Sequence, residues 1–242
     1  MKTISKLVLL IFILPLTSCS QADFNKITKE VDKTIKGNKP LTNDEIIRGL
    51  KEALNVGSKN ASTSASKLDG FFRNTIIKIP FPPEAKEMET KLRSIGMNKQ
   101  VDEFILTVNR AAEEAAKQAA PVFMNAVTSM TINDGLSILR GKDTAATAYL
   151  RRTTGAQLHN MFKPKIKDAT QKVQVTKYWN PLASTYNALP FVKKVNPDLE
   201  EYITQRALTG LFYLVSQEEI KIRKDPAARV TEILKRVFGS AK

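Results

Sequence analysis

The sequence predicts an all-α protein with a single multi-helix domain of about eight to ten helices. Apolar residues recur every three to four positions along most of the chain, which is the period of a helix with one buried face. The alternation of apolar and polar residues that is typical of strands persists nowhere. Capping residues and prolines stand where such helices would begin or end. With 242 residues, 42% of them hydrophobic, the chain is long enough to bury one large core.

The first expected helices lie on either side of Gly37 and Pro40, which stop the helical period. Residues 24–35 form the first, and Thr42 or Asn43 can cap the second because both side chains accept hydrogen bonds from the first turn. The apolar stripe of this second helix consists of Ile46, Ile47, Leu50, Leu54, Ala61 and Ala65.

An irregular connection is expected near residues 69–83, DGFFRNTIIKIPFPP. Its β-branched residues and its three prolines break the helical period. We expect this connection to be extended and to pack against helices rather than to form a sheet. Pro82 and Pro83 suit the first turn of the next helix, which runs to Gly96.

The middle of the chain predicts a long helical segment followed by a short helix. The long segment covers residues 98–130, and Pro121 is expected to kink or restart it because proline removes a backbone hydrogen bond. Thr131 caps the short helix, with Asp134 in a variant of the capping box.

Two prolines are expected to divide the helices that follow. Asp143 starts a helix that Pro164 should interrupt. A connection around residues 179–181, Trp-Asn-Pro, then precedes a short helix near Tyr186.

The last third carries two start signals of one kind, a capping residue followed by proline. Residues 196–198, Asn-Pro-Asp, begin a helix that runs to Arg223, and residues 225–226, Asp-Pro, begin the final helix. The apolar positions of that final helix are Val230, Ile233, Leu234 and Val237. No internal repeat or long linker divides the chain, so residues 41–240 are expected to form one helical domain.

The amino terminus, MKTISKLVLLIFILPLTSC, has two lysines and then an apolar run from Leu7 to Leu14. The run is too short to span a bilayer and has the length of a secretory signal. Residues 16–19, Leu-Thr-Ser-Cys, resemble the bacterial lipoprotein signal. The resemblance implies that residues 1–18 are a cleaved signal peptide. It also implies that Cys19, the only cysteine, becomes the first mature residue and carries diacylglycerol and usually an amide-linked acyl chain such as palmitate.

The expected location follows from that lipid. Residues 19–40 would form the lipidated N-terminus, a tether and the first helix. Two or three acyl chains hold a protein firmly on a membrane, because each buried methylene contributes about 0.8 kcal/mol. We therefore expect a lipid-anchored protein of the cell envelope. Ser20, rather than aspartate, follows the cysteine, and by analogy with enteric lipoproteins this favours the outer membrane, facing the periplasm, over the inner membrane.

The chain is strongly basic, with 38 Lys and Arg, 24 Asp and Glu, and a formal net charge of +14. Removal of Lys2 and Lys6 with the leader leaves 38 − 2 = 36 basic residues and a net charge of +12. Export argues against nucleic acid as the partner, whereas anionic lipids or envelope polymers fit this charge. The alternative is that the scattered lysines form only a solvated surface.

The sequence lacks the residues that several kinds of catalytic and metal sites require. His159 is the only histidine, so sites with several histidines and serine–histidine catalysis lack ligands, and a helix-surface position is expected for it. Lipidation of Cys19 would remove thiol chemistry. Gly135 and Gly141 do not have the spacing of a phosphate-binding loop. We therefore expect no catalytic residue, no metal ion and no cofactor.

One stretch, NRAAEEAAKQAA at residues 109–120, places charges among alanines on one expected helix. Residues four apart share a face, so a buried face would need paired charges, for which partners are expected on the late helix. The candidate polar network consists of Asn109, Arg110, Glu113, Glu114, Glu218, Glu219 and Arg223. One hypothesis is a structural network that fixes helix register. The other is a hydrolase or cation-binding site centred on Glu113 and on Glu218 or Glu219.

Aromatic residues form a second group, which either belongs to the core or lines a cavity for an apolar ligand such as an acyl chain. The group consists of Phe71, Phe72, Phe81, Phe104, Phe123, Phe162, Tyr178, Trp179, Tyr186, Phe191 and Phe212. Together with the polar network it leaves three functional hypotheses. They are a membrane-tethered protein with a binding or structural role, a carboxylate-dependent hydrolase or cation-binding protein, and a carrier.

Five stretches cover nearly all of residues 41–238, namely LTNDEIIRGLKEAL, DGFFRNTIIKIPFPPEA, VDEFILTVNRAAEEAA, MTINDGLSILRGKDTAATAYL and DLEEYITQRALTGLFYLVSQEEIKIRKDPAARVTEILKRVF. In combination they resemble the uncharacterised bacterial family called domain of unknown function 4197. The resemblance implies an exported, mostly helical protein, often a lipoprotein, and brings no established activity or catalytic residue.

Overall fold

The structure is a computed structural model that describes residues 41–172, 175–192, 194 and 199–240. These residues are predominantly helical and include no strand, which confirms the all-α prediction. The chain from Leu41 onward makes one compact unit. Its elements are α2 (Asn43–Ser66), η1 (Pro83–Ala85), α3 (Lys86–Ser94), α4 (Asn98–Ala116), α5 (Ala119–Thr128), α6 (Ile132–Arg140), α7 (Ala145–Lys172), α8 (Val175–Asn187), α9 (Leu199–Lys224), η2 (Pro226–Ala228) and α10 (Glu232–Ser240).

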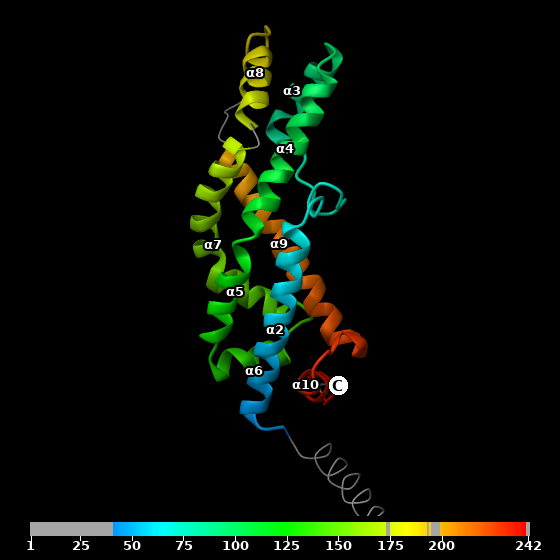
Figure 1. Ribbon diagram of the computed structural model, residues 1–242, viewed down its shortest axis with the longest axis vertical. Helices are drawn as coiled ribbons and strands as arrows, with labels where there is room; N and C mark the ends of the chain where they lie inside the picture. The colour runs from blue at the N-terminus through cyan, green and yellow to red at the C-terminus, as the bar shows by residue number, and fades with distance from the viewer. Residues whose placement is uncertain (1–40, 173–174, 193, 195–198, 241–242) are drawn as a thin grey trace, which may run out of the picture. The chain divides into compact units, whose positions relative to one another are not determined.

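Helix α9 is the centre of the packing, because it lies against α7 and against α2 (Figure 1). At one end of the domain α4 packs against α3 and α8, and at the other end α2 packs against α6 and α10. Most of the buried apolar residues of these helices form one hydrophobic cluster. Within the described ranges, none of the helices is both long and apolar enough to cross a membrane.

The helix starts at Thr42 and Thr131 follow the sequence prediction. The Thr42 hydroxyl accepts a hydrogen bond from the Glu45 backbone N–H at 3.2 Å, and the Glu45 carboxylate accepts one from the Thr42 N–H at 3.0 Å. This backbone bond, followed by the ion pair with Arg236 of α10, lowers the pKa of Glu45 to about 2. Thr131 and Asp134 form the same reciprocal box at the start of α6. Both caps join residues three positions apart, and so they could be predicted from the local sequence.

Two proline-based predictions are wrong, because burial outweighs the local breaker signal. Helix α7 continues through Pro164 instead of being interrupted there. Phe162 and Ile166, on either side of this proline, are both fully buried, and their packing offsets the lost hydrogen bond. Residues 179–181 are not a connection but lie inside α8. Trp179 is buried there, with its ring centroid 5.0 Å from that of Phe104.

Other boundaries differ from the prediction by a few residues. The break expected at Pro121 occurs just before it, so that Pro121 stands in the first turn of α5. Asp225 caps only the short η2 turn, and α10 begins later. Val230 therefore lies outside the final helix and is 66% exposed. The expected helix at 24–35, the lipid site Cys19 and the start signal at 196–198 lie outside the described residues.

Residues 67–83, which we call the α2–α3 loop, pack against helices without forming a strand, as predicted. Their first part is a series of turns rather than an extended segment, with backbone hydrogen bonds such as Lys78 N–H to Asn74 carbonyl at 2.8 Å. Phe71 and Ile77 are buried against Gly210 of α9, where an added Cβ would lie 2.9 and 3.0 Å from them. The missing side chain at Gly210 therefore leaves room for the loop.

Candidate functional site

Asn109 of α4 is completely buried and holds the end of the α2–α3 loop. Its side-chain oxygen accepts a hydrogen bond from the Ile79 N–H, and its amide nitrogen donates to the Ile79 carbonyl, both at 2.8 Å. The same nitrogen donates to the Ile105 carbonyl at 2.7 Å. One side chain thus satisfies both backbone groups of a buried loop residue, which would otherwise be costly to bury.

Glu113, one helical turn further along α4, holds the beginning of the same loop. Its side chain is 5% exposed, and one oxygen accepts from the backbone N–H groups of Phe71 at 3.1 Å and Phe72 at 3.2 Å. Its other oxygen receives Arg110 Nη1 at 2.7 Å, and Arg110 Nη2 donates to Asp69 at 2.6 Å. The buried carboxylate is therefore both paired and hydrogen-bonded, as a buried charge requires.

Glu219 and Arg223 of α9 form a second cluster, at the start of α7. The Glu219 carboxylate accepts from the N–H groups of Ala146 at 2.9 Å and Thr147 at 2.8 Å, and from the Thr147 hydroxyl at 2.8 Å. Arg223 pairs with Glu219 at 2.9 Å and donates to the Ile138 carbonyl at 2.9 Å. A carboxylate at a helix N-terminus satisfies unpaired N–H groups and is favoured by the helix dipole.

The structure therefore divides the candidate polar network, and the predicted partners of Glu113 on α9 are wrong. In the described part of the chain, no hydrogen bond or ion pair joins Glu113 to Glu218 or Glu219. Glu218 instead accepts from Asn60 of α2 at 2.8 Å, and Glu114 forms an exposed pair with Lys117. The face of α4 that carries Glu113 contacts the α2–α3 loop rather than Glu218 or Glu219 of α9. The helical period alone does not show which segment packs against that face.

A third cluster joins α7 to α9 around Glu201. His159 Nε2 lies 2.8 Å from Glu201 Oε1, Lys163 donates to its other oxygen at 2.9 Å, and Gln205 donates at 2.8 Å. These donors, Lys163 first and then His159 and Gln205, lower the pKa of Glu201 to about 2. The prediction of a helix-surface position for His159 is confirmed, since its side chain is 32% exposed. The sequence analysis did not identify Glu201 as the partner of His159, from which it is 42 residues away in the chain.

The Glu201 cluster makes stability depend on pH. Because the pKa of Glu201 is about 2 in the folded chain against 4.5 ordinarily, its contribution is present above about pH 5 and is lost as pH falls toward 2. The side chain is about one-third exposed, so we expect about 1 kcal/mol at pH 7. Urea unfolding of wild type and Glu201→Gln should give this difference at pH 7 and a much smaller one at pH 2.5. An equal difference at both values would contradict the assignment.

A small pocket lies between α2, α9 and α10. It measures about 340 Å³ including its open mouth, and its wall is mainly apolar, with Leu54, Val215 and Phe238 beside Glu219 and Arg223.

Most of the predicted aromatic group lies away from this pocket, in the buried core. Its buried members are Phe71, Phe81, Phe104, Phe123, Phe162, Trp179, Tyr186 and Phe212. Phe191 is fully exposed, Phe72 is half-buried, and the side chain of Tyr178 lies outside the description.

Among the described residues, no three or more His, Cys, Asp and Glu side chains are placed together so as to hold a metal ion. The carboxylates of the three clusters accept hydrogen bonds from backbone, arginine, lysine and amide donors.

A comparison with protein families gives a match that covers nearly all of the helices described above. A model of the family described as "Protein of unknown function (DUF4197)" matches residues 40–239. The chain belongs to this family. Neither a curated protein nor a solved structure matches this chain. The three polar clusters and the α2–α3 loop all lie within the DUF4197 domain.

Proposed function

We propose that this DUF4197 protein is a lipid-anchored protein of the cell envelope, whose helical domain binds anionic lipid headgroups or envelope polymers. Cys19 behind its basic and apolar leader supports the anchor. The proposed place is the outer membrane, facing the periplasm, because serine follows the cysteine. The role of the domain is binding or structural support, without catalysis.

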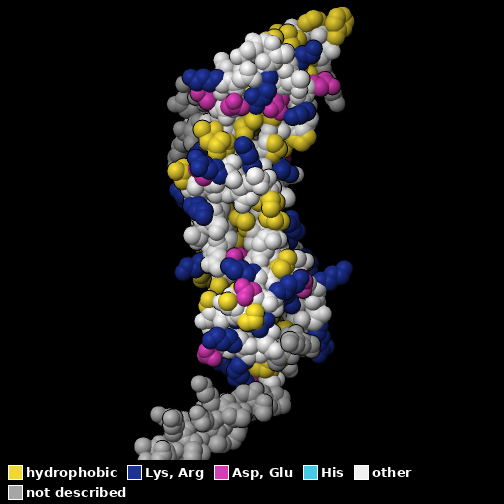
Figure 2. Space-filling model, turned by 90° about the vertical axis from the view of Figure 1, so that its right-hand side faces the viewer, with side chains coloured by type: hydrophobic (Ala, Val, Ile, Leu, Met, Phe, Trp, Pro, Cys, Tyr) yellow, Lys and Arg dark blue, Asp and Glu magenta, His cyan; other side chains and the backbone are white. Residues whose placement is uncertain are grey.

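The observation that carries the binding role is a surplus of exposed positive charge. Many carboxylates of the domain are already engaged in ion pairs, among them Asp69, Glu89, Asp143 and Glu201. The described structure gives no ion pair to several exposed lysines, namely Lys59, Lys91, Lys165, Lys167 and Lys221. Figure 2 shows Lys and Arg side chains spread along the visible face, with fewer Asp and Glu between them. Such lysines can attract an anionic surface with about 1 kcal/mol each.

We prefer this role to the carboxylate-dependent one because the acidic side chains support the fold. Glu113 holds the α2–α3 loop and Glu219 caps α7. Glu113 is buried, the Glu219 side chain is 8% exposed, and both carboxylates accept from several donors, so they offer no pair of carboxylates converging on an open cleft.

The experiment for this proposal tests the anchor and the charge separately. For the anchor, cells expressing wild type and Cys19→Ser are labelled with radioactive palmitate. Wild type should be labelled and should fractionate with outer membranes, whereas Cys19→Ser should carry no label. Wild-type protein that keeps residues 1–18 or a free thiol would overturn the anchor.

For the charge, the mature chain without lipid, residues 19–242 with Cys19→Ser, is mixed with phosphatidylglycerol vesicles. We expect binding at low ionic strength that falls steeply with added salt, because the Debye length shortens to about 8 Å near 0.15 M. Vesicles of phosphatidylcholine alone are the control and should bind little. Absence of binding to anionic vesicles even at low salt would overturn the charge part of the proposal.

A further inference from the structure

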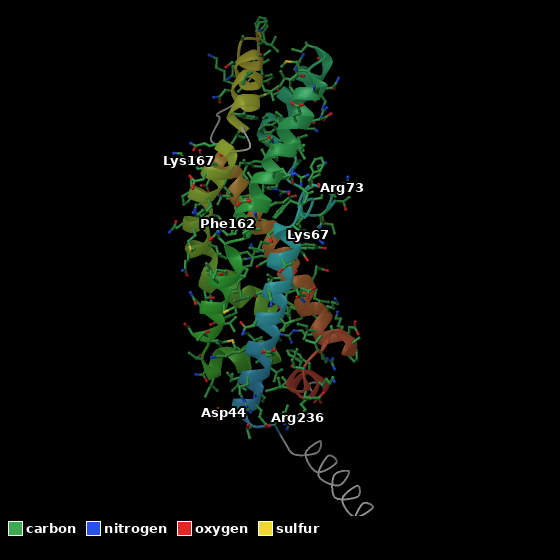
Figure 3. All side chains as sticks on the ribbon, viewed as in Figure 1. Asp44, Lys67, Arg73, Phe162, Lys167 and Arg236 are labelled. Carbon is green, nitrogen blue, oxygen red and sulfur yellow. The ribbon has the colours of Figure 1, made fainter. Side chains whose placement is uncertain are left out.

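The α2–α3 loop exposes two large aliphatic side chains among basic residues. Leu68 is 74% exposed and Ile76 is 62% exposed. Lys67 precedes Leu68 and is itself exposed, and the Arg73 side chain is 80% exposed. Figure 3 shows Lys67 and Arg73 on this loop, with Arg73 pointing out from the body of the domain.

The charge of this loop is positive after its internal pairs are counted. Asp69 is the only acidic residue between positions 67 and 78, and it is shared by Arg73 at 2.9 Å and Arg110 at 2.6 Å. Lys67 has no ion pair in the described structure, and Lys78 lies 4.4 Å from the centre of the Phe72 ring. The two aliphatic side chains therefore belong to a loop segment with three basic residues and one acidic residue.

Hydrogen bonds hold the loop in place, so Leu68 and Ile76 are exposed to a partner without any rearrangement of the loop. Glu113 fixes its backbone at Phe71 and Phe72, and Asn109 fixes it at Ile79. Within it, the Asn74 side-chain oxygen accepts from the Ile76 N–H at 3.1 Å. Tyr202 of α9 donates to the Pro80 carbonyl at 3.1 Å. A surface fixed in advance loses little conformational entropy when a partner covers it.

We propose that residues 67–78 are the segment of this protein that enters the headgroup region of an anionic phospholipid bilayer. Leu68 and Ile76 enter the boundary between headgroups and acyl chains, while Lys67, Arg73 and Lys78 contact lipid phosphates. Burial of exposed aliphatic side chains lowers the free energy only if the partner has an apolar region beside its negative charges. A bilayer offers both, whereas a soluble anionic polymer offers only charge. This inference rests on the proposed membrane location and names the surface that meets the lipid.

The experiment uses tryptophan as a depth probe, because Trp179 is the only natural tryptophan and is buried. Leu68→Trp and Ile76→Trp are made in the mature chain with Cys19→Ser. Val230→Trp is the matched control, since Val230 is 66% exposed and lies outside the loop. On phosphatidylglycerol vesicles, the loop probes should shift to shorter emission wavelength and be quenched by brominated acyl chains. The control should do neither.

A charge-reversal pair tests whether the cations of the loop act locally. Lys67→Glu with Lys78→Glu should weaken vesicle binding at least tenfold more than Lys91→Glu with Lys221→Glu, which changes the net charge equally. Equal weakening by the two pairs would overturn the local role of the loop. Circular dichroism and the emission of Trp179 in chains without an added tryptophan verify that each variant is folded.

The remaining outcomes separate this inference from the proposed function. If the chain binds vesicles but both loop probes stay in water, the loop assignment is wrong while charge-driven binding stands. If the loop probes shift without vesicles and light scattering reports a dimer, the surface is a contact between copies and the assignment is wrong. If nothing binds vesicles at low salt, both the charge part of the proposed function and the loop assignment are wrong.

Discussion

Replacing Glu113 with alanine is expected to lower the free energy of unfolding by about 3–5 kcal/mol. The carboxylate accepts two backbone N–H groups, from Phe71 and Phe72, and pairs with Arg110. Its removal leaves these buried or half-buried donors without their acceptor, and leaves Arg110 with Asp69 as its one ion-pair partner among the described residues. Urea or thermal unfolding measures the change, and a loss of this size corresponds to roughly 10 °C in a domain of about 200 residues.

The matched control for Glu113→Ala is Glu114→Ala, at the next position of the same helix. Glu114 is 49% exposed and pairs with the exposed Lys117, so its replacement should cost less than about 1 kcal/mol. Equal losses from the two substitutions would show that the loop contacts of Glu113 do not contribute to stability. The lost stability should appear as early hydrogen exchange of the Phe71 and Phe72 amides, because they become the least protected part of the loop.

Gly70→Ala is the second substitution for which we expect a large loss, about 3 kcal/mol. A Cβ at this position would lie 2.4, 2.6 and 2.9 Å from the backbone oxygens of Ser64, Ala65 and Lys67. These are backbone atoms at the end of α2, so they cannot move aside as a flexible side chain can. The chain must shift where it turns from α2 into the loop, and the position of Phe71 shifts with it.

Gly155→Ala is the opposite case and serves as the control. Gly155 lies within α7, and nothing would lie within 4 Å of an added Cβ. Alanine there should stabilise the chain by about 0.5–1 kcal/mol, because glycine loses more backbone freedom on helix formation. Melting temperatures of the two variants should therefore move in opposite directions. A stable Gly70→Ala variant with unchanged protection of the loop amides would contradict the close approach.

The polar network illustrates which contacts a sequence can predict. The expectation that a buried charge on α4 is paired held for Glu113, but the expected partners on α9 were wrong. Besides Arg110 of the same helix, its donors are loop residues 41 and 42 positions earlier in the chain. No local pattern relates these positions, although the Asp69-Gly70 pair after a helix does signal a turn. Glu201 was missed for the same reason, since His159 and Lys163 reach it from another helix.

The sequence by itself determined the helical class, the capped starts at Thr42 and Thr131, and the irregular segment before Pro82, because each depends on residues within a few positions of one another. Only the tertiary structure decided that α7 continues through Pro164 and that Trp179 lies in a buried helix. There the packing of apolar side chains against distant helices outweighs the cost of a missing backbone hydrogen bond.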